Sequence, residues 1–446
     1  MNPVLGDIIP PLENLKSRIS ESEIVRVNGR VEQVVGLVIE SSGPSSSVGE
    51  ACWITAADGA GQPVLAEVVG FRQHHVLLMP LAEMRGLGPG SEVVKTGEPF
   101  KIPVGKELLG RVIDAMGKPL DGKGPLGAMN EKYSIHREPP PAMERRRIET
   151  PMPTGVRAID SVLTLGEGQR LGIFAGSGVG KSTLLGMIAR NTEADVNVIA
   201  LVGERGREVR DFLERDLGEK GLARSVVVVA TSDQPSLVRI QAALVATAVA
   251  EYFRDQGKRV MLMMDSVTRF AMAQREVGLA IGEPPTTKGY TPSVFALLPK
   301  LLERAGTTAH QGSITGLYTI LVEADDMNEP VADACRAILD GHVVLSRELA
   351  AQNHYPAIDV LNSVSRVMRD IVGAEQAAAA GKIRSILSTY KSVEDLISIG
   401  AYVKGSNPKV DQALLLLEAV QGFLKQGREE NAGWKETLQK MKSFLN

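Results

Sequence analysis

Hydrophobic and polar positions along this chain follow three successive patterns, and the first is that of β-strands. Between residues 23 and 95, short β-rich runs at residues 24–27, 34–39 and 64–69 are separated by turns that contain Gly and Ser. Runs of this kind, bounded by such turns, are typical of a small β-barrel. We therefore predict a β-barrel domain over residues 23–95.

The second pattern, over residues 96–370, alternates strand-like runs with helical segments. A stretch rich in Gly at residues 105–121 is typical of a connector into this domain. The strand-like runs lie at residues 171–174, 196–202, 226–229, 260–264, 318–322 and 343–345. Such alternation predicts an α/β domain in which a mostly parallel sheet is covered by helices on both faces. Because ligands of such sheets bind at the carboxyl ends of the strands, residues directly after the strands are the candidate site.

The third pattern is helical and covers residues 371–446. Two apolar faces at helical spacing consist of Ile383, Ile386, Leu387 and Tyr390, and of Leu414, Leu417, Val420, Phe423 and Leu424. A Gly-Ser-Asn-Pro breaker at residues 405–408 separates them. We therefore predict a C-terminal helical domain.

Residues 1–22 precede these regions and carry three apolar residues at helical spacing, Leu12, Leu15 and Ile19. Such a short amphipathic segment fits a partner-binding helix. It equally fits a frayed terminus or a strut on the next domain. We predict a partner-binding segment and leave the other interpretation open.

A glycine-rich loop ending in Gly-Lys-Ser-Thr follows the first strand of the α/β domain and leads into a helix. Its residues are Ala175, Gly176, Ser177, Gly178, Val179, Gly180, Lys181, Ser182 and Thr183. Backbone amides of such a loop surround phosphate oxygens, the lysine adds a charge, and the first hydroxyl can contact Mg²⁺. The usual pattern, G-x-x-x-x-G-K-[ST], has glycine where this chain has Ala175. The loop nevertheless predicts binding of a nucleoside triphosphate.

Two carboxylates directly follow later strands of the same domain. Asp265 follows residues 260–264, and we expect it to hold Mg²⁺ together with Ser182, because Mg²⁺ prefers hard oxygen ligands. The alternative for Asp265 is a simple helix cap. Glu204 follows residues 198–203 and could polarise the water that attacks the terminal phosphate. Its alternative is a surface ion pair with Arg205 or Arg207.

Composition narrows the class of protein. The 446 residues include 50 basic and 53 acidic ones, and only 4% are aromatic, so we expect no nucleic-acid partner. Cys52 and Cys335 are the two cysteines, too few for a disulfide framework, which favours a reducing compartment. We find no spanning stretch or signal-peptide core, so we expect a cytoplasmic protein with at most peripheral membrane association.

Several segments together resemble the catalytic subunits of the rotary ATPases, and more closely the ATPase of the flagellar type III protein export apparatus. Residues 356–366 resemble the signature in which a terminal arginine, here Arg366, reaches the neighbouring subunit's nucleotide. Residues 203–205 are similar to the segment with the catalytic glutamate, and residues 265–270 to the magnesium-site segment. Residues 175–182, 326–330 and 399–402 resemble the flagellar branch.

The resemblance implies a RecA-like P-loop NTPase core that hydrolyses ATP with Mg²⁺. It implies catalytic roles for Lys181, Glu204 and Arg366. Because one chain carries both Glu204 and Arg366, we expect a homohexamer whose sites are shared between protomers. The alternative for Arg366 is an internal ion pair with a carboxylate such as Asp359.

The adenine pocket is the part of the resemblance that fits least well. Alignment by eye puts Ala377 where the family has a stacking tyrosine. Phe423 resembles the other adenine-pocket aromatic, and core packing of its ring is the equal alternative. Base selectivity is therefore expected to be loose.

The resemblance also implies the partners of the protein and its location in the cell. These are a flagellar export regulator or stator protein at the N-terminus, a stalk protein, the export gate, and export substrates with their chaperones, at the inner membrane. Three rival functions stay open: an injectisome ATPase, a nucleotide-binding ring subunit that does not hydrolyse, and a nucleic-acid translocase.

Overall fold

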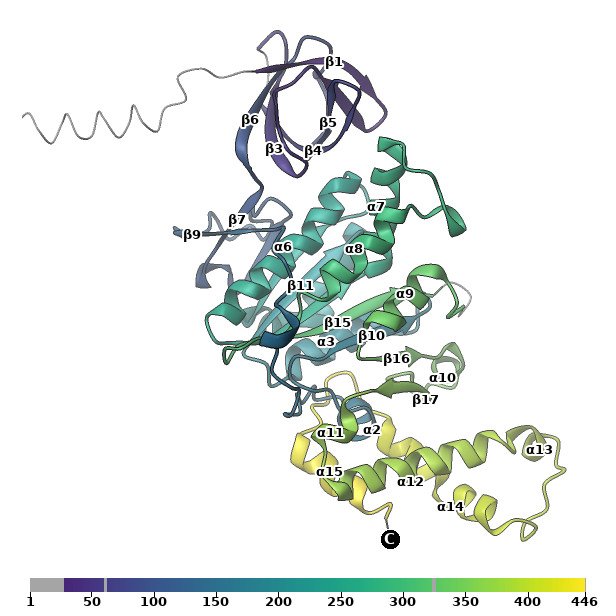
Figure 1. The fold of residues 1–446 in the computed structure, drawn as a ribbon. Coiled ribbons are helices and arrows are strands. Elements are labelled where there is room, and N and C mark those ends of the chain that lie inside the picture. Colours follow the sequence, from purple (N-terminus) through teal and green to yellow (C-terminus); the bar gives the residue numbers. More distant parts are fainter. Residues whose placement is uncertain (1–27, 60–61, 323–325, 446) are drawn as a thin grey trace, which may run out of the picture. The chain divides into compact units, whose positions relative to one another are not determined.

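A computed structural model describes residues 28–59, 62–322 and 326–445, and the chain divides after Phe100 into two compact units. Figure 1 shows the elements of both. The predicted partner-binding segment, residues 1–22, lies outside the described residues.

The first unit contains a closed antiparallel barrel, which confirms the predicted β-barrel architecture. The strands are joined in the order β1-β2-β5-β4-β3-β6. Their bounds are β1 (Gly29–Val35), β2 (Val38–Ser41), β3 (Glu50–Thr55), β4 (Val64–Arg72), β5 (His75–Pro80) and β6 (Glu92–Pro99). Val31, Ile39, Cys52 and Ile54 are among the buried residues that fill it. Closure pairs every strand on both sides, so this sheet has no exposed edge.

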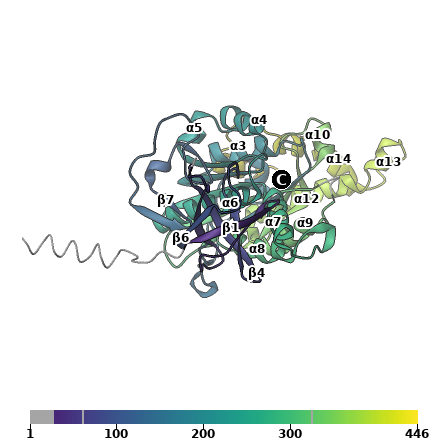
Figure 2. The ribbon, with the colours of Figure 1, turned by 90° about the horizontal axis from the view of Figure 1, so that it is seen from above.

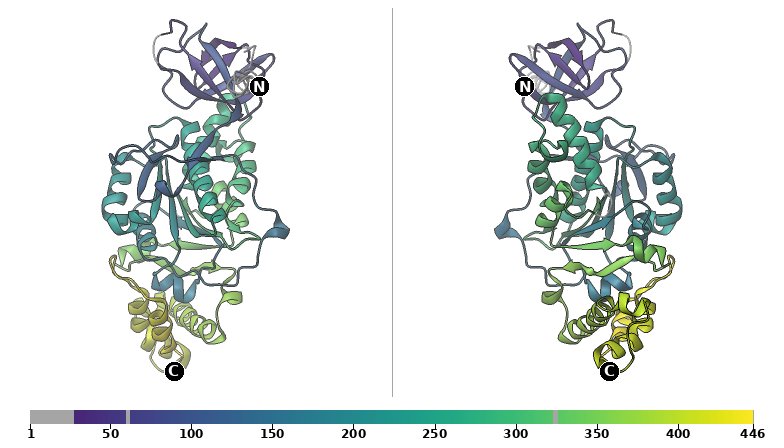
Figure 3. Two further views of the ribbon diagram at one scale, coloured as in Figure 1. Left: turned by 90° about the vertical axis from the view of Figure 1, so that its left-hand side faces the viewer. Right: turned by 90° about the vertical axis from the view of Figure 1, so that its right-hand side faces the viewer.

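The second unit is built on a large, mostly parallel sheet with helices on both sides of the strands (Figure 3). The order is β17-β16-β10-β15-β13-β11-β12-β8, with β14 beside β15. The strands are β8 (Arg111–Asp114), β10 (Arg170–Ala175), β11 (Val196–Val202), β12 (Ser225–Ala230), β13 (Arg259–Asp265), β14 (Gly306–Thr307), β15 (Ser313–Leu321), β16 (Gly341–Leu345) and β17 (Ile358–Ser365). This confirms the predicted α/β class. Strand β8 was missed, because the sequence analysis assigned its residues to the connector.

The helices of this domain follow the strands along the chain. They are α2 (Arg157–Val162), α3 (Lys181–Asn191), α4 (Gly206–Asp211), α5 (Gly218–Ala223), α6 (Ser236–Asp255), α7 (Val267–Ile281), α8 (Pro292–Leu302), α9 (Pro330–Ile338), α10 (Arg347–Ala351) and α11 (Met368–Ile371). A π-helical stretch, Phe212–Leu217, joins α4 and α5, and a separate pair, β7 (Lys101–Val104) and β9 (Glu131–Ser134), follows the barrel.

Helix α6 is long and apolar enough to cross a membrane, a property that the sequence analysis overlooked. However, 89% of its most apolar window is buried inside the fold. The core contacts of the domain therefore account for its hydrophobicity.

The last part of the chain is helical, as predicted. It consists of α12 (Ala374–Lys391), α13 (Glu394–Ser398), α14 (Pro408–Leu424) and α15 (Trp434–Lys442). Helices α12 and α14 lie side by side and lead to α13 at the far end (Figures 1 and 2). Ile383 and Val420 are buried, as the predicted apolar faces require.

Candidate functional site

The glycine-rich loop connects β10 to α3 and starts at the carboxyl end of a central strand. Gly178 and Gly180 have φ values of 81° and 94°, a backbone region that only glycine adopts readily. Ala175 is still part of β10, paired in register with Leu321 and Leu345, and fully buried. Its methyl group is therefore accommodated in the core, and the turn begins one residue later, at Gly176.

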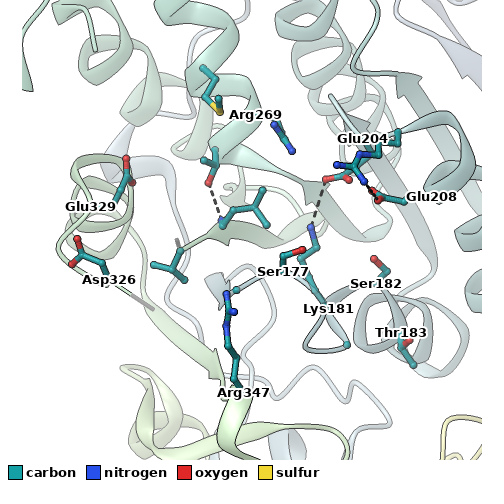
Figure 4. A pocket seen from close by; sticks show the side chains of 18 of the residues that line it. Ser177, Lys181, Ser182, Thr183, Glu204, Glu208, Arg269, Asp326, Glu329 and Arg347 are labelled. Atoms are coloured by element: carbon teal, nitrogen blue, oxygen red, sulfur yellow. Dashed lines mark hydrogen bonds and ion pairs between the residues drawn. The ribbon is translucent and has the colours of Figure 1, made fainter. Parts of the chain in front are cut away.

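Lys181, at the start of α3, contacts both carboxylates that the sequence analysis singled out, and Figure 4 shows it beside one of them, Glu204. Its Nζ donates to Asp265 Oδ1 at 2.5 Å and lies 3.6 Å from Glu204 Oε1. Parallel strands β11 and β13 bring the carboxylates together, because Leu201 and Asp265 are in register. The structure thus joins Lys181, Glu204 and Asp265 in one cluster.

Asp265 is almost fully buried and is further fixed from strand β15. The Thr319 hydroxyl donates to Asp265 Oδ1 at 2.8 Å, and Thr319 is fully buried. A hydrogen bond to a buried carboxylate stabilises its charged form and holds its orientation.

Electrostatics distinguish Glu204 from Lys181 within the cluster. Burial raises the pKa of Glu204, and the negative charge of Asp265 raises it further, to about 7. Burial acts to lower the pKa of Lys181, but the charges of Asp265 and Glu204 outweigh it and raise the pKa above its usual value. Glu204 Oε1 is buried and has no hydrogen-bond partner among the described residues. A carboxylate with a pKa near neutrality, whose oxygen has the Lys181 ion pair but no hydrogen bond, is suited to accept a proton from water.

A cavity of about 790 Å³ opens above the loop, and several cationic side chains line it. Ser182 and Thr183 line it beside Lys181, and Arg269 and Arg347 line it from other elements (Figure 4). A volume of this order can hold a nucleotide-sized ligand. The concentration of positive side chains around a glycine loop favours a polyphosphate.

Arg347 is a site residue that the sequence analysis missed. It begins α10 directly after β16, at the same sheet edge as the loop. A Cβ atom on Gly176 would lie 2.5 Å from its Nη2, so the guanidinium packs against the loop backbone at a position where a side chain would collide. Its place after a predicted strand was the signal that could have found it.

Mg²⁺ fits the oxygen donors at this edge. Asp265 contributes a carboxylate and Ser182 a hydroxyl, both of them hard ligands. Among the described residues, no group of three or more His, Cys, Asp or Glu side chains could hold a metal by itself. This donor set suits an ion that shares its coordination with substrate phosphates and water rather than one held in a protein cage.

Arg366 lies away from this cluster. It follows β17, which is antiparallel to β16, and Ser365 pairs with Gly341 at the amino end of β16. The residue is exposed, and its guanidinium donates to the Arg336 carbonyl at 3.2 Å. Asp359, the alternative partner, instead accepts hydrogen bonds from Leu361 and Asn362.

The two positions that the sequence analysis discussed for the adenine pocket line neither cavity beside the loop. Phe423 is buried in the helical part, with its ring 5.5 Å from that of Phe444, and lines neither described cavity beside the loop. Ala377 is exposed on α12. Two aromatic residues line the cavities beside the loop: Tyr290 lines the larger one, and Tyr355 lines a second cavity of about 300 Å³ together with Gly180 and Thr183. The role of Phe423 in base binding stays a prediction, and its position favours the core alternative.

Known proteins match the chain from the barrel to the last helices. Residues 31–97 and 155–365 match the beta-barrel and nucleotide-binding domains of the ATP synthase alpha/beta family. Residues 372–443 match the T3SS EscN ATPase C-terminal domain.

Individual relatives are similar over almost their whole length. The flagellum-specific ATP synthase of Bacillus subtilis is 58% identical over 93% of this chain and 94% of its own. The type 3 secretion system ATPase of Xanthomonas euvesicatoria is 52% identical over 98% of both. The assembled ATPase EscN from the type III secretion system of enteropathogenic E. coli superposes with a TM-score of 0.88, at 46% identity over 94% of this chain and 100% of EscN.

The fold and the loop thus define a P-loop nucleotide-binding protein with a RecA-like core, an N-terminal β-barrel and a C-terminal helical domain. Within that class, the chain belongs to the ATP synthase alpha/beta family, in the branch of flagellum-specific ATP synthases and type 3 secretion system ATPases. The resemblance stated from the sequence is confirmed.

Proposed function

We propose that this chain hydrolyses ATP in a homohexameric ring and thereby energises export of flagellar proteins through a type III secretion apparatus. The observation that carries the proposal is the cluster of Lys181, Glu204 and Asp265 at the glycine loop. Relatives named flagellum-specific ATP synthase, from Bacillus subtilis and Salmonella typhimurium among others, support the flagellar assignment. An injectisome ATPase is the alternative, because type 3 secretion system ATPases match at comparable identity.

Each member of the cluster has a distinct role in the proposed reaction. The loop amides from Gly176 to Thr183 and Lys181 hold the triphosphate, and Glu204 accepts the proton of the attacking water. Lys181 donates a hydrogen bond to Asp265, and we expect the phosphate oxygens to compete with this carboxylate for its ammonium group. Glu204 in its ionised form then orients the water toward the terminal phosphorus.

Mg²⁺ would be held by Asp265, usually through a water, and by Ser182. When bound with ATP, the ion neutralises charge on the phosphate oxygens. Among the chain's own residues, Thr319 keeps the Asp265 carboxylate in place through its hydroxyl hydrogen bond.

Arg366 would act on the nucleotide of the next protomer. Strand β17 runs antiparallel to β16, so its last residue lies beside the amino end of β16. Arg366 therefore follows at the end of the strands opposite to the glycine loop, about 13 Å from that loop along the strand direction. Exposure at that edge makes it available to a neighbour and unsuitable for its own site. An arginine supplied by a neighbouring chain is worth about 10³–10⁵ in the rate of related hydrolases.

The base of ATP would lie in the cavity beside Tyr355 rather than at Ala377. Phe423 was the other candidate from the sequence and is placed in the helical core. The cavity is open and mostly apolar around Tyr355, which is consistent with stacking and with loose selectivity among bases.

Partners and location extend the proposal. The solved complex of EscN with its central stalk EscO, at 45% identity and a TM-score of 0.86, supports self-assembly and a stalk partner for this chain. We further propose an export regulator or stator protein on residues 1–22, and contacts with the export gate, substrates and chaperones. The ring would work in the cytoplasm, peripherally at the inner membrane. We propose four functional regions: a partner-binding segment (1–22), the β-barrel domain (23–95), the nucleotide-binding domain with its connector (96–370) and the helical domain (371–446).

A single substitution tests hydrolysis against mere nucleotide binding. Glu204→Gln keeps the size of the side chain but cannot accept the proton, so kcat should fall by about 10²–10⁴ while ATP binding is retained. Glu214→Gln, at an exposed glutamate that pairs with Arg210 and does not line the cavity, is the matched control and should stay active. Undiminished turnover by the Glu204 variant would reject the assigned role and favour a non-hydrolysing subunit.

Mixed rings test the shared site. Lys181→Ala protomers have no working loop but can lend Arg366, and Arg366→Ala protomers have a working loop but lend nothing. If sites are shared, mixing the two inactive variants restores turnover. No turnover from mixed rings whose assembly is verified by native mass spectrometry would remove the role in trans.

A further inference from the structure

One helix, α9, connects the protomer's own nucleotide cavity with the arginine at the opposite edge of its sheet. Its residues Val331, Ala332 and Cys335 are buried, so its inner face is packed into the domain. At about 1.5 Å per residue, its nine residues span about 13 Å. A packed helix of this length moves as one unit rather than bending.

The amino end of α9 lies at the cavity. Glu329, the capping residue, lines the cavity, and its Oε2 accepts hydrogen bonds from the amides of Val331 at 3.0 Å and Ala332 at 3.1 Å. Asp326 also lines this end of the cavity (Figure 4), and its Oδ2 lies 3.5 Å from the Nζ of Lys288, another lining residue. The cap that fixes the start of α9 therefore faces the space that nucleotide enters.

The carboxyl end of α9 holds Arg366. The carbonyl of Arg336, in the last turn of the helix, accepts from the Arg366 guanidinium, and the Asp340 carbonyl just beyond it accepts from the Arg366 amide at 3.0 Å. Carbonyls at a helix end have no partner within the helix and attract a cation. Any displacement of α9 thus changes where the Arg366 side chain lies.

We propose that α9 couples the occupancy of one protomer's nucleotide cavity to the position of the arginine that this protomer lends to its neighbour, with Glu329 as the positioning residue at the cavity. Polyphosphate that enters the cavity repels the Glu329 carboxylate. Because this carboxylate caps α9, the repulsion displaces the first turn of the helix. The shift reaches Arg366 through the Arg336 and Asp340 carbonyls. In a ring, the nucleotide occupancy of each site would change the position of the arginine at the next site, always in the same direction around the ring. This inference rests on the proposed role of Arg366 in trans.

The test uses full-length chains in mixed rings, with two kinds of arginine donor. Both donors are inactive at their own site: Glu204→Gln binds ATP and is occupied, whereas Lys181→Ala is empty. The acceptor is Arg366→Ala, whose site is intact. Coupling through α9 predicts that turnover per acceptor differs between occupied and empty donors by about fivefold or more. KM for ATP should be equal, because the acceptor site is the same in both mixtures.

Removing the cap should abolish that difference. With Glu329→Ala added to both donors, turnover per acceptor is expected to become the same for occupied and empty donors. Glu329→Asp, which can still cap the helix, is the matched control for folding and assembly and should retain part of the difference. Thermal melts and native mass spectrometry of each mixture verify that the variants fold and assemble.

The outcomes separate this inference from the function on which it rests. Equal turnover from occupied and empty donors overturns the coupling, and so does a difference that survives Glu329→Ala. If neither donor restores turnover in assembled rings, the role of Arg366 in trans fails, and the coupling fails with it. Restored turnover without a difference leaves the shared site intact and rejects only α9.

Discussion

The raised pKa of Glu204 makes the pH dependence of hydrolysis predictable. Burial and the charge of Asp265 raise this pKa from an ordinary 4.5 to about 7. Only the ionised carboxylate can take a proton from water, so kcat/KM, which reports the free enzyme, must fall as the pH is lowered through 7.

The size of the fall follows from the fraction of Glu204 that is ionised. About half is ionised at pH 7 and about a tenth at pH 6, so kcat/KM should drop about fivefold between them, and about 50-fold between pH 7 and pH 5. With an ordinary glutamate, more than about 95% would still be ionised at pH 6, and the rate would be nearly constant.

Glu208 supplies the control. Hydrogen bonding to Glu208 and its charge also raise the pKa of Glu204. Glu208→Gln removes the charge, so the acid limb should move to lower pH while the maximal rate is kept. Ionisation of the ATP phosphates is common to both proteins and cannot produce a difference between them.

The assay is steady-state phosphate release by assembled rings at constant ionic strength, between pH 5 and 8.5, with saturating Mg²⁺. A wild-type midpoint below about pH 5.5 would refute the reasoning, because burial and Asp265 would then not govern Glu204. Superimposable profiles of wild type and Glu208→Gln would refute the contribution of Glu208.

Three further substitutions test other parts of the site. Arg366→Ala should lower kcat of assembled rings by about 10³–10⁵-fold, while ATP still binds. Arg366→Lys should recover only part of the lost rate, since lysine lacks the planar guanidinium fork. Steady-state hydrolysis measures both effects. Thr319→Val removes the hydroxyl that holds Asp265 and should lower the free energy of unfolding by about 1.5–3 kcal/mol. Urea denaturation followed by circular dichroism measures this change. A change near zero would contradict the contribution of this hydrogen bond. Tyr355→Ala should weaken ATP binding by about 1–3 kcal/mol in a fluorescent-nucleotide titration, leaving inorganic triphosphate binding unchanged; equal loss for both ligands would exclude stacking.

The adenine pocket depends on tertiary contacts that motif reasoning does not supply. Alignment by eye put Ala377 where the family has a stacking tyrosine, which left base stacking in doubt there; Ala377 is an exposed residue of α12 and lines neither cavity beside the loop. Tyr355 precedes the signature, and only the return of β17 beside β16 brings the start of that strand back to the loop. Phe423 had the helical spacing of a core residue, and its contact with Phe444 agrees with that pattern.

The sequence by itself determined what is local: the glycine loop, the carboxylates that follow two strands, and the periodicities that separate barrel, α/β core and helices. These depend on backbone preferences and on alternation of apolar positions, which neighbouring residues encode. Tertiary structure decided which distant groups meet, such as Arg347 at Gly176, and that Arg366 faces away from its own loop. It also set the pKa of Glu204, because burial and the approach of Asp265 exist only once β11 and β13 lie side by side.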